Sequence, residues 1–196
     1  MTEKNEIKSA IEAARNSSNA EITELVEQWL ANKWCVPPGF VDDFFEMQIS
    51  TYFLLVWPIF EHDVCDGFME TGKILDVARK FGNCYDEMDI DVILKKFYER
   101  YKDRNSPNSN WNGLCHDDSS RAKSNAERVL NIGWNRSDSV AKLQFGLYVI
   151  YRFRNNIFHG NKQIFEWLHN REQIEDCVRV LLSLTVFYEK TKKQKQ

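Results

Sequence analysis

The chain has 196 residues, of which 43% are hydrophobic and 28% charged, and its net charge is −3. These values are typical of a soluble globular protein with one good hydrophobic core. The slight negative charge excludes a global field that would draw the chain onto nucleic acid or a membrane, so any contact with nucleic acid must be local.

The cysteine residues and the N-terminal segment indicate that the protein is cytoplasmic. Five cysteines without a C-x-x-C pair favour reduced thiols over a zinc knuckle or a disulfide framework. The N-terminus, MTEKNEIKSAIEAARNSS, lacks the apolar core of a secretory signal. The longest apolar run, Tyr52 to Phe60, is too short to cross a bilayer. We therefore expect a cytoplasmic protein that makes no membrane contact.

The first half of the chain predicts helices. Apolar residues at helical spacing predict a first helix from about Asn19 to the PPGF turn at Pro37. The long apolar segment after this turn has hydrophobic residues around most of its circumference, which predicts a central helix, kinked at Pro58. Further helices are predicted around residues 68–81 and 87–102.

The domain organisation follows from composition. Residues 1–19 are polar and predicted to be loosely ordered, residues 20–190 form a single helical domain, and residues 191–196 form a basic tail. Inside the domain, residues 103–125 are rich in Asn and Ser and have no period, which predicts a long inserted loop. Neither an internal repeat nor a confident strand pattern is visible. The predicted fold class is therefore all-α, a helical bundle with an inserted polar loop region.

The most regular pattern predicts a helix from Ser139 to His159. Ser137, Asp138 or Ser139 can cap its start, and Gly160 can stop it. A short helix is predicted before it, in AERVLNIGW, and a last helix after it, over roughly residues 163–190.

This helix from Ser139 to His159 has two different faces. On a wheel of about 100° per residue, an ordinary core stripe is centred on Phe153. The opposite face mixes aromatic and polar side chains: Gln144, Leu147, Tyr148, Tyr151, Arg154, Asn155, Phe158 and His159. A solvent face would not normally hold so many aromatic and aliphatic residues. A two-fold dimer contact that buries Leu147, Tyr148 or Tyr151 between chains is one economical explanation.

The helix ends in a cluster of polar residues, YRFRNNIFHG. Asn155 and His159 are one turn apart and Arg154 flanks them. Arg154, Asn155 and His159, with four residues between the Arg and the His and Gly160 next, resemble the signature of the HEPN superfamily. The resemblance covers roughly residues 138–190. It implies a helical bundle that dimerises so that two Arg–His motifs meet in one cleft.

The resemblance implies a metal-independent endoribonuclease, of the kind found among toxins and phage-defence effectors. RNA carries its own nucleophile, the ribose 2′-hydroxyl. His159 could transfer protons near neutral pH, and Arg154 could hold two phosphate oxygens at once. Asn155 would orient its neighbours, and Tyr151 or Phe158 could stack on a base. Glu61 is the candidate, by position alone, for the supporting residue on an earlier helix.

Other site chemistries are weaker. The acidic runs EHDVCD and CYDEMDID lack a recognisable ligand spacing, so we expect no metal and no cofactor. Cys115 beside His116 does not make a nucleophile and base, because the fold normally brings such pairs together. Two functions stay open. One is the nuclease, with an RNA substrate and an antitoxin or regulatory partner; the other is a non-catalytic HEPN module that binds a partner protein or a nucleotide.

Overall fold

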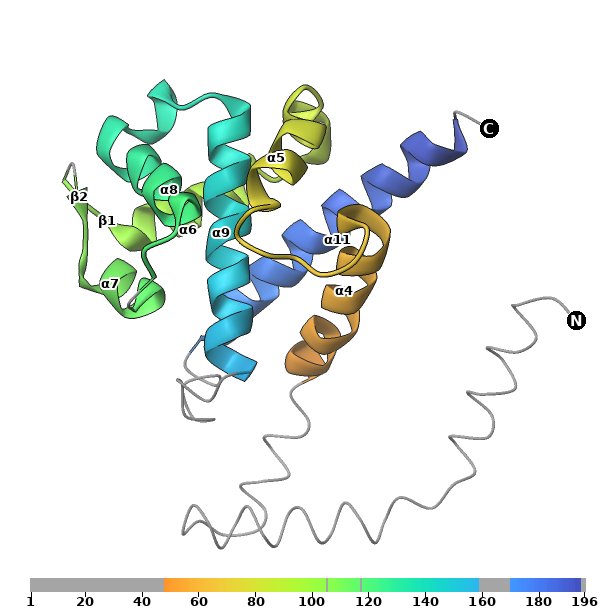
Figure 1. The fold of residues 1–196 in the computed structure, drawn as a ribbon, viewed down its shortest axis with the longest axis horizontal. Coiled ribbons are helices and arrows are strands. Elements are labelled where there is room, and N and C mark those ends of the chain that lie inside the picture. The colour runs from red at the N-terminus through yellow and green to blue at the C-terminus, as the bar shows by residue number, and fades with distance from the viewer. Residues whose placement is uncertain (1–47, 105, 117, 159–169, 195–196) are drawn as a thin grey trace, which may run out of the picture. The chain divides into compact units, whose positions relative to one another are not determined.

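The computed structural model describes residues 48–104, 106–116, 118–158 and 170–194, and these are mostly helical (Figure 1). The α-helices are α4 (Gln48–Cys65), α5 (Ile74–Gly82), α6 (Asp91–Tyr101), α7 (Ser109–Cys115), α8 (Arg121–Ile132), α9 (Ser139–Phe158) and α11 (Arg171–Lys193). Short 3₁₀ turns cover Tyr85–Met88 and Trp134–Arg136, and β1 (Lys102–Asp103) pairs antiparallel with β2 (Ser106–Pro107). The predicted all-α class is confirmed.

Several predicted segments lie outside the described residues. They are residues 1–19, for which loose order was predicted, the segment of the predicted first helix, and residues 159–169, which contain His159, Gly160 and the start of the predicted last helix. Of that last helix the structure describes α11, which continues to Lys193 and so includes part of the predicted tail. None of the described helices combines the length and the apolar character that crossing a membrane requires.

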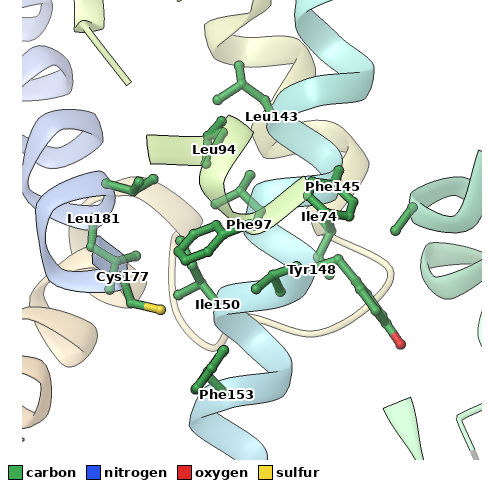
Figure 2. Packing of buried hydrophobic residues seen from close by; sticks show 14 of the residues in the cluster. Ile74, Leu94, Phe97, Leu143, Phe145, Tyr148, Ile150, Phe153, Cys177 and Leu181 are labelled. Atoms are coloured by element: carbon green, nitrogen blue, oxygen red, sulfur yellow. The ribbon is translucent and has the colours of Figure 1, made fainter. Parts of the chain in front are cut away.

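The central helix of the described fold is α9. Every residue from 143 to 150 is buried, so this part of the helix is covered all round. Figure 2 shows why: Cys177 and Leu181 of α11 lie on one side of α9, and Tyr148 points away from them on the other. Gly146 allows the approach of α6, because a methyl group at this position would overlap the side chain of Leu94.

In contrast, α4 buries only one of its faces. Its buried side chains follow helical spacing: Phe53, Trp57, Phe60 and Val64. Its other face exposes Tyr52, Leu54, Leu55 and Ile59 by 42–59%. The prediction that this segment is the central helix is therefore wrong. Hydrophobic residues around a whole circumference indicate that both faces are apolar, but not that both are covered.

Two helix starts differ from the sequence prediction because turns precede them. Asp66 and Gly67 have positive φ angles, of 51° and 110°, and the Gly67 amide donates to the Glu61 carbonyl, so α5 begins only at Ile74. Asp89, in the left-handed region at φ 50°, separates the first 3₁₀ turn from α6. The helices predicted around residues 68–81 and 87–102 are present, but each starts later than expected.

The predicted inserted loop is folded, which corrects the sequence interpretation. Residues 103–125 contain most of the β1–β2 ladder, all of α7 and the start of α8. The Asn and Ser residues that suggested a loop include helix caps: Asn108 Oδ1 accepts the Trp111 amide at 3.1 Å, and Ser120 Oγ accepts the Lys123 amide at 3.2 Å. Trp111 is completely buried and stacks on Phe145 of α9, with ring centroids 5.9 Å apart. The segment is part of the core.

The start of α9 agrees with one of the three predicted caps. Asp138 Oδ1 accepts the amide hydrogen of Ala141 at 2.7 Å, which satisfies one of the amides that a helix N-terminus leaves open. The short helix predicted in AERVLNIGW is also present, as the second half of α8.

Candidate functional site

The motif arginine lies in the last turns of α9 beside α4. Arg154 is half-buried, and its Nη1 donates to Asn155 Oδ1 at 3.1 Å. Its guanidinium carbon lies 5.8 Å from the centre of the Trp57 ring, within reach of a cation–π interaction. Asn155 and the aromatic ring together restrict the orientation of the guanidinium, which favours a fixed positive charge at this end of the helix.

The second arginine of the cluster has a different environment. Arg152 donates from Nε to the Leu114 carbonyl at 3.2 Å and from Nη2 to the Cys115 carbonyl at 2.9 Å. Asn156, one turn further on and completely buried, donates from Nδ2 to the same Leu114 carbonyl at 3.0 Å. These carbonyls belong to the last turn of α7, where a helix leaves acceptors open. Arg152 and Asn156 therefore join the end of α7 to α9.

A carboxylate and a phenol extend this contact. Asp118 lies 3.8 Å from Arg152 Nη1 and accepts the Tyr148 hydroxyl at 2.7 Å. Burial raises the pKa of Asp118, but the hydrogen bonds from Tyr148 and Ser120 and the charge of Arg152 outweigh it and hold the pKa below its usual value. Burial, together with the hydrogen bonds to Cys115 and Asp118, raises the pKa of Tyr148. Asp118 is therefore charged at neutral pH, and Tyr148 is a neutral donor.

The predicted dimer face of α9 is mostly internal. Leu147 is 2% exposed and Tyr148 is fully buried, although only one chain is present, because α7, α8 and the residues between them cover this side of the helix. Of the three residues predicted for the contact between chains, Leu147 and Tyr148 are wrong, because they are buried inside one chain, and a contact through Tyr151 stays a prediction. Tyr151, Arg154 and Asn155 are only half-buried, so the face remains accessible in its last turns.

The side chain of Glu61 forms a hydrogen bond with the turn that follows its own helix, α4. Its Oε1 accepts the Met69 amide at 2.8 Å and so holds the turn that follows α4. Lys80 and Lys73 of the next segment donate to the Val64 and Cys65 carbonyls, which closes the same helix end. Glu61 lies one turn after Trp57, on the same side of α4. Its supporting role at the motif stays a prediction.

The side chains of two predicted site residues, Phe158 and His159, lie outside the described residues. Phe158 is the last residue of α9, but its side chain lies outside the described residues, as does the whole of His159. The contact between Asn155 and His159, expected from their spacing of one turn, therefore stays a prediction, as does base stacking by Phe158.

The remaining candidates have no catalytic geometry. Within the described ranges, no group of three or more His, Cys, Asp and Glu residues is placed to hold a metal ion. His62 contacts the neighbouring Asp63, at 2.7 Å on the surface. Cys115 is fully buried, and burial raises its pKa, so its thiol is protonated, whereas His116 is exposed. The adjacent Cys115 and His116 do not form a nucleophile and base.

Sequence reasoning missed the residues that hold α7 against α9: Asp118, Arg152 and Asn156. One signal was available, because Trp111 inside a polar stretch is an unusual residue for a solvated loop. No family model, curated protein or solved structure matches this chain, so the assignment of a function depends on the motif and on the geometry around it.

Proposed function

We propose that this protein is a metal-independent endoribonuclease of the HEPN type, acting as a toxin or as an anti-phage defence effector. One observation carries the proposal. Of the two arginines and two asparagines in RFRNN, Arg152 and Asn156 join α7 to α9, whereas Arg154 and Asn155 contact each other beside Trp57 at a half-buried position. Arg154 and Asn155, which belong to the motif, are therefore the two of these four residues that lie away from the contact between α7 and α9.

The proposed chemistry divides the reaction between two side chains. The 2′-hydroxyl of the substrate attacks the adjacent phosphorus, and the bond to the 5′-oxygen of the next nucleotide breaks. Arg154 stabilises the negative charge that develops on the phosphate, and its fixed orientation makes that stabilisation effective. His159 transfers a proton, either from the attacking hydroxyl or to the leaving oxygen. With two motifs in a dimer, one histidine serves each step and no metal ion is needed.

The exposed face of α4 supports a dimer better than α9 does. Leu54, Leu55 and Ile59 are exposed by 42–59%, whereas Trp57, whose ring faces Arg154, belongs to the buried face of the same helix. An exposed apolar patch of this kind is typical of an interaction surface. Analytical ultracentrifugation of Leu55→Asp tests this, with Val92→Asp as the control, because Val92 is an apolar residue on α6 that is at least as exposed.

The function is tested by expressing the wild-type protein and His159→Ala in the same host. Wild type should stop growth and leave cut RNA, whereas His159→Ala should remove nearly all cleavage, because a positioned acid or base contributes about 10²- to 10⁴-fold. Arg128→Gln, an exposed change on α8, is the control and should behave as wild type. Cleavage by purified protein should also persist in EDTA. Cleavage that needs added magnesium, or that survives His159→Ala, would contradict the proposal.

The second candidate is a non-catalytic HEPN module that binds a partner protein or a nucleotide. The apolar face of α4 favours the first of these, because such a surface suits a different chain as well as a second copy. The discriminating measurement is cleavage by the purified chain. A folded dimer that cuts no RNA would support the scaffold and contradict the nuclease.

A further inference from the structure

A hollow of about 650 Å³ lies at the opposite end of α9 from the motif. It is bordered by the end of α6, by β1 and Arg104, by the end of α8 and by the 3₁₀ turn Trp134–Arg136, which leads into α9. Its walls include the aromatic side chains of Tyr98 and Trp134, whose rings pack 5.5 Å apart between centroids and are held in the core. The hollow therefore has a rigid aromatic wall.

More basic than acidic side chains line this hollow. Its lining contains four basic side chains (Lys95, Lys102, Arg104 and Arg136) against two acidic ones (Glu99 and Asp103). The excess of two positive charges contrasts with the net charge of −3 of the whole chain. The lining also includes Asn131 and Asn135, whose amides can donate to and accept from a ligand. These groups suit an anion that carries polar substituents.

Most of this charge is not neutralised by neighbours. Lys95 lies 4.0 Å from Glu99, but Lys102, Arg104 and Arg136 form no salt bridge within the described residues. Lys102 instead lies over the Tyr98 ring, 4.9 Å from its centre. The three cations line one hollow, where a phosphate group could contact more than one of them.

Another hollow on the surface, between α6 and α11, provides a comparison. Its lining has three basic and three acidic side chains. Lys96 and Arg179 there are paired with Asp176, at 3.4 Å, and with Glu175, at 2.6 Å. A hollow whose charges are matched in this way has no need of an external anion, whereas the hollow beside Arg104 and Arg136 has unmatched cations.

We propose that the hollow lined by Lys102, Arg104 and Arg136 binds the backbone phosphates of single-stranded RNA, away from the cleavage site. As a subsite of a nuclease it rests on the proposed function. Ser139 and Arg154 are separated by roughly 22 Å along α9, at about 1.5 Å per residue. The hollow would therefore hold a part of the RNA several nucleotides from the cut. It would contribute to substrate affinity and leave the chemical step to the motif.

The test separates binding from cleavage. A fluorescent single-stranded RNA with 2′-O-methyl groups lacks the nucleophile, so it reports binding alone. The double variant Arg104→Gln/Arg136→Gln should bind it at least tenfold more weakly than wild type. The dependence of log affinity on log salt should also flatten by about 0.7 for each lost phosphate contact. The control is Arg121→Gln/Arg128→Gln, which removes the same charge from exposed positions on α8 and should keep nearly full affinity.

Each outcome decides the proposal. Equal affinity in the two double variants overturns it, and so does displacement of the RNA by ATP at a similar concentration, which would indicate a mononucleotide site. With cleavable RNA, the hollow variant should raise KM and leave kcat unchanged. Failure of the nuclease proposal is recognised separately: wild type would cut nothing, while the hollow variant would still bind 2′-O-methyl RNA more weakly than the control does.

Discussion

Arg152 and Arg154 are two residues apart on one helix, yet their surroundings differ. Arg152 faces α7, where its guanidinium donates to two backbone carbonyls and lies near Asp118. Arg154 faces α4, where it lies over the Trp57 ring, and it donates to Asn155, its neighbour on α9. The two sides of α9 divide a polar cluster into a structural half and a candidate functional half.

The two sides of the cluster should therefore respond differently to substitution. Residues on the α7 side should change the free energy of unfolding and leave the cleavage rate of folded molecules unchanged. Residues on the α4 side should do the reverse. A variant on one side that changes the quantity expected for the other side would contradict this division of the cluster.

Among variants of the described cluster, the largest effect is expected for Arg154→Lys. The charge is kept, but the fork that can hold two phosphate oxygens is lost, so cleavage should fall by about 10²- to 10³-fold, as for other preorganised groups that stabilise transition-state charge. The melting curve should superimpose on that of wild type. A matched set of cleavage rates and melting curves checks both. A variant that melts much earlier, or cuts as fast as wild type, would place Arg154 in the structural half.

Arg152→Ala should reverse this pattern. It removes one donor from each of two carbonyls at the end of α7, which keep the Asn156 amide and the Asp118 backbone amide as donors, and it leaves Asp118 without its nearby cation. The side chains of Arg152 and Asp118 are only 14% and 10% exposed. Breaking such a pair costs about 3 kcal/mol. Urea unfolding measures the loss, and cleavage per folded molecule should stay at the wild-type value. Phe153→Ala, a core change that costs about 3–5 kcal/mol, calibrates the assay.

Tyr148→Phe should have a smaller and pH-dependent effect. It removes a hydrogen bond to the charged Asp118, which contributes about 2 kcal/mol. Because the folded pKa of Asp118 is lowered, its stabilisation is present above the usual pKa of an aspartate and is lost as pH falls through the folded pKa. The difference between variant and wild type should therefore be full at neutral pH and narrow in acid. Urea unfolding at both pH values measures it.

The control for this change is Tyr151→Phe. Tyr151 lies one turn from Tyr148 on the same helix and is half-buried, and no hydrogen bond of its hydroxyl is recorded within the described residues. This variant should unfold as wild type does at every pH. A constant deficit for Tyr148→Phe from neutral pH to acid would show that lost packing, rather than the Asp118 bond, causes the effect.

The sequence predicted the parts of the fold that local chemistry determines. The periodic pattern from Ser139 onward gives the position of α9, and an N-terminal cap at Asp138 follows from the preference of short polar side chains for open amides. Phe153 and its stripe are buried as predicted. In each case the residues that decide the outcome are neighbours in the chain.

The failures come from contacts between distant residues. Polar residues such as Asn108 and Ser120 occur both as helix caps and in loops, so the amino-acid composition of this segment does not distinguish the two structures. The segment is folded because Trp111 is buried against α9. The candidate site shows the same limit. Spacing selects Arg154 and Asn155, but the separate role of Arg152 depends on the carbonyls of α7, thirty-eight residues away from it in the chain. The contact between Arg152 and the carbonyls of α7 cannot be recognised from the sequence of one protein.

The smallest effect on cleavage is expected for Asn155→Ala. Asn155 accepts one hydrogen bond from Arg154 at 3.1 Å, so its loss lets the guanidinium turn without removing it. A single hydrogen bond to a charged group contributes about 1.5 kcal/mol, which corresponds to roughly a tenfold lower kcat. Because Asn155 carries no proton in the reaction, the pH profile of kcat should keep the wild-type shape. Asn155→Ala should also leave the unfolding free energy nearly unchanged, since the residue is on the α4 side. A shifted pH profile would mean that Asn155 controls the protonation of the catalytic groups. A loss as large as that of Arg154→Lys would mean that the orientation of Arg154, more than its charge, limits the rate.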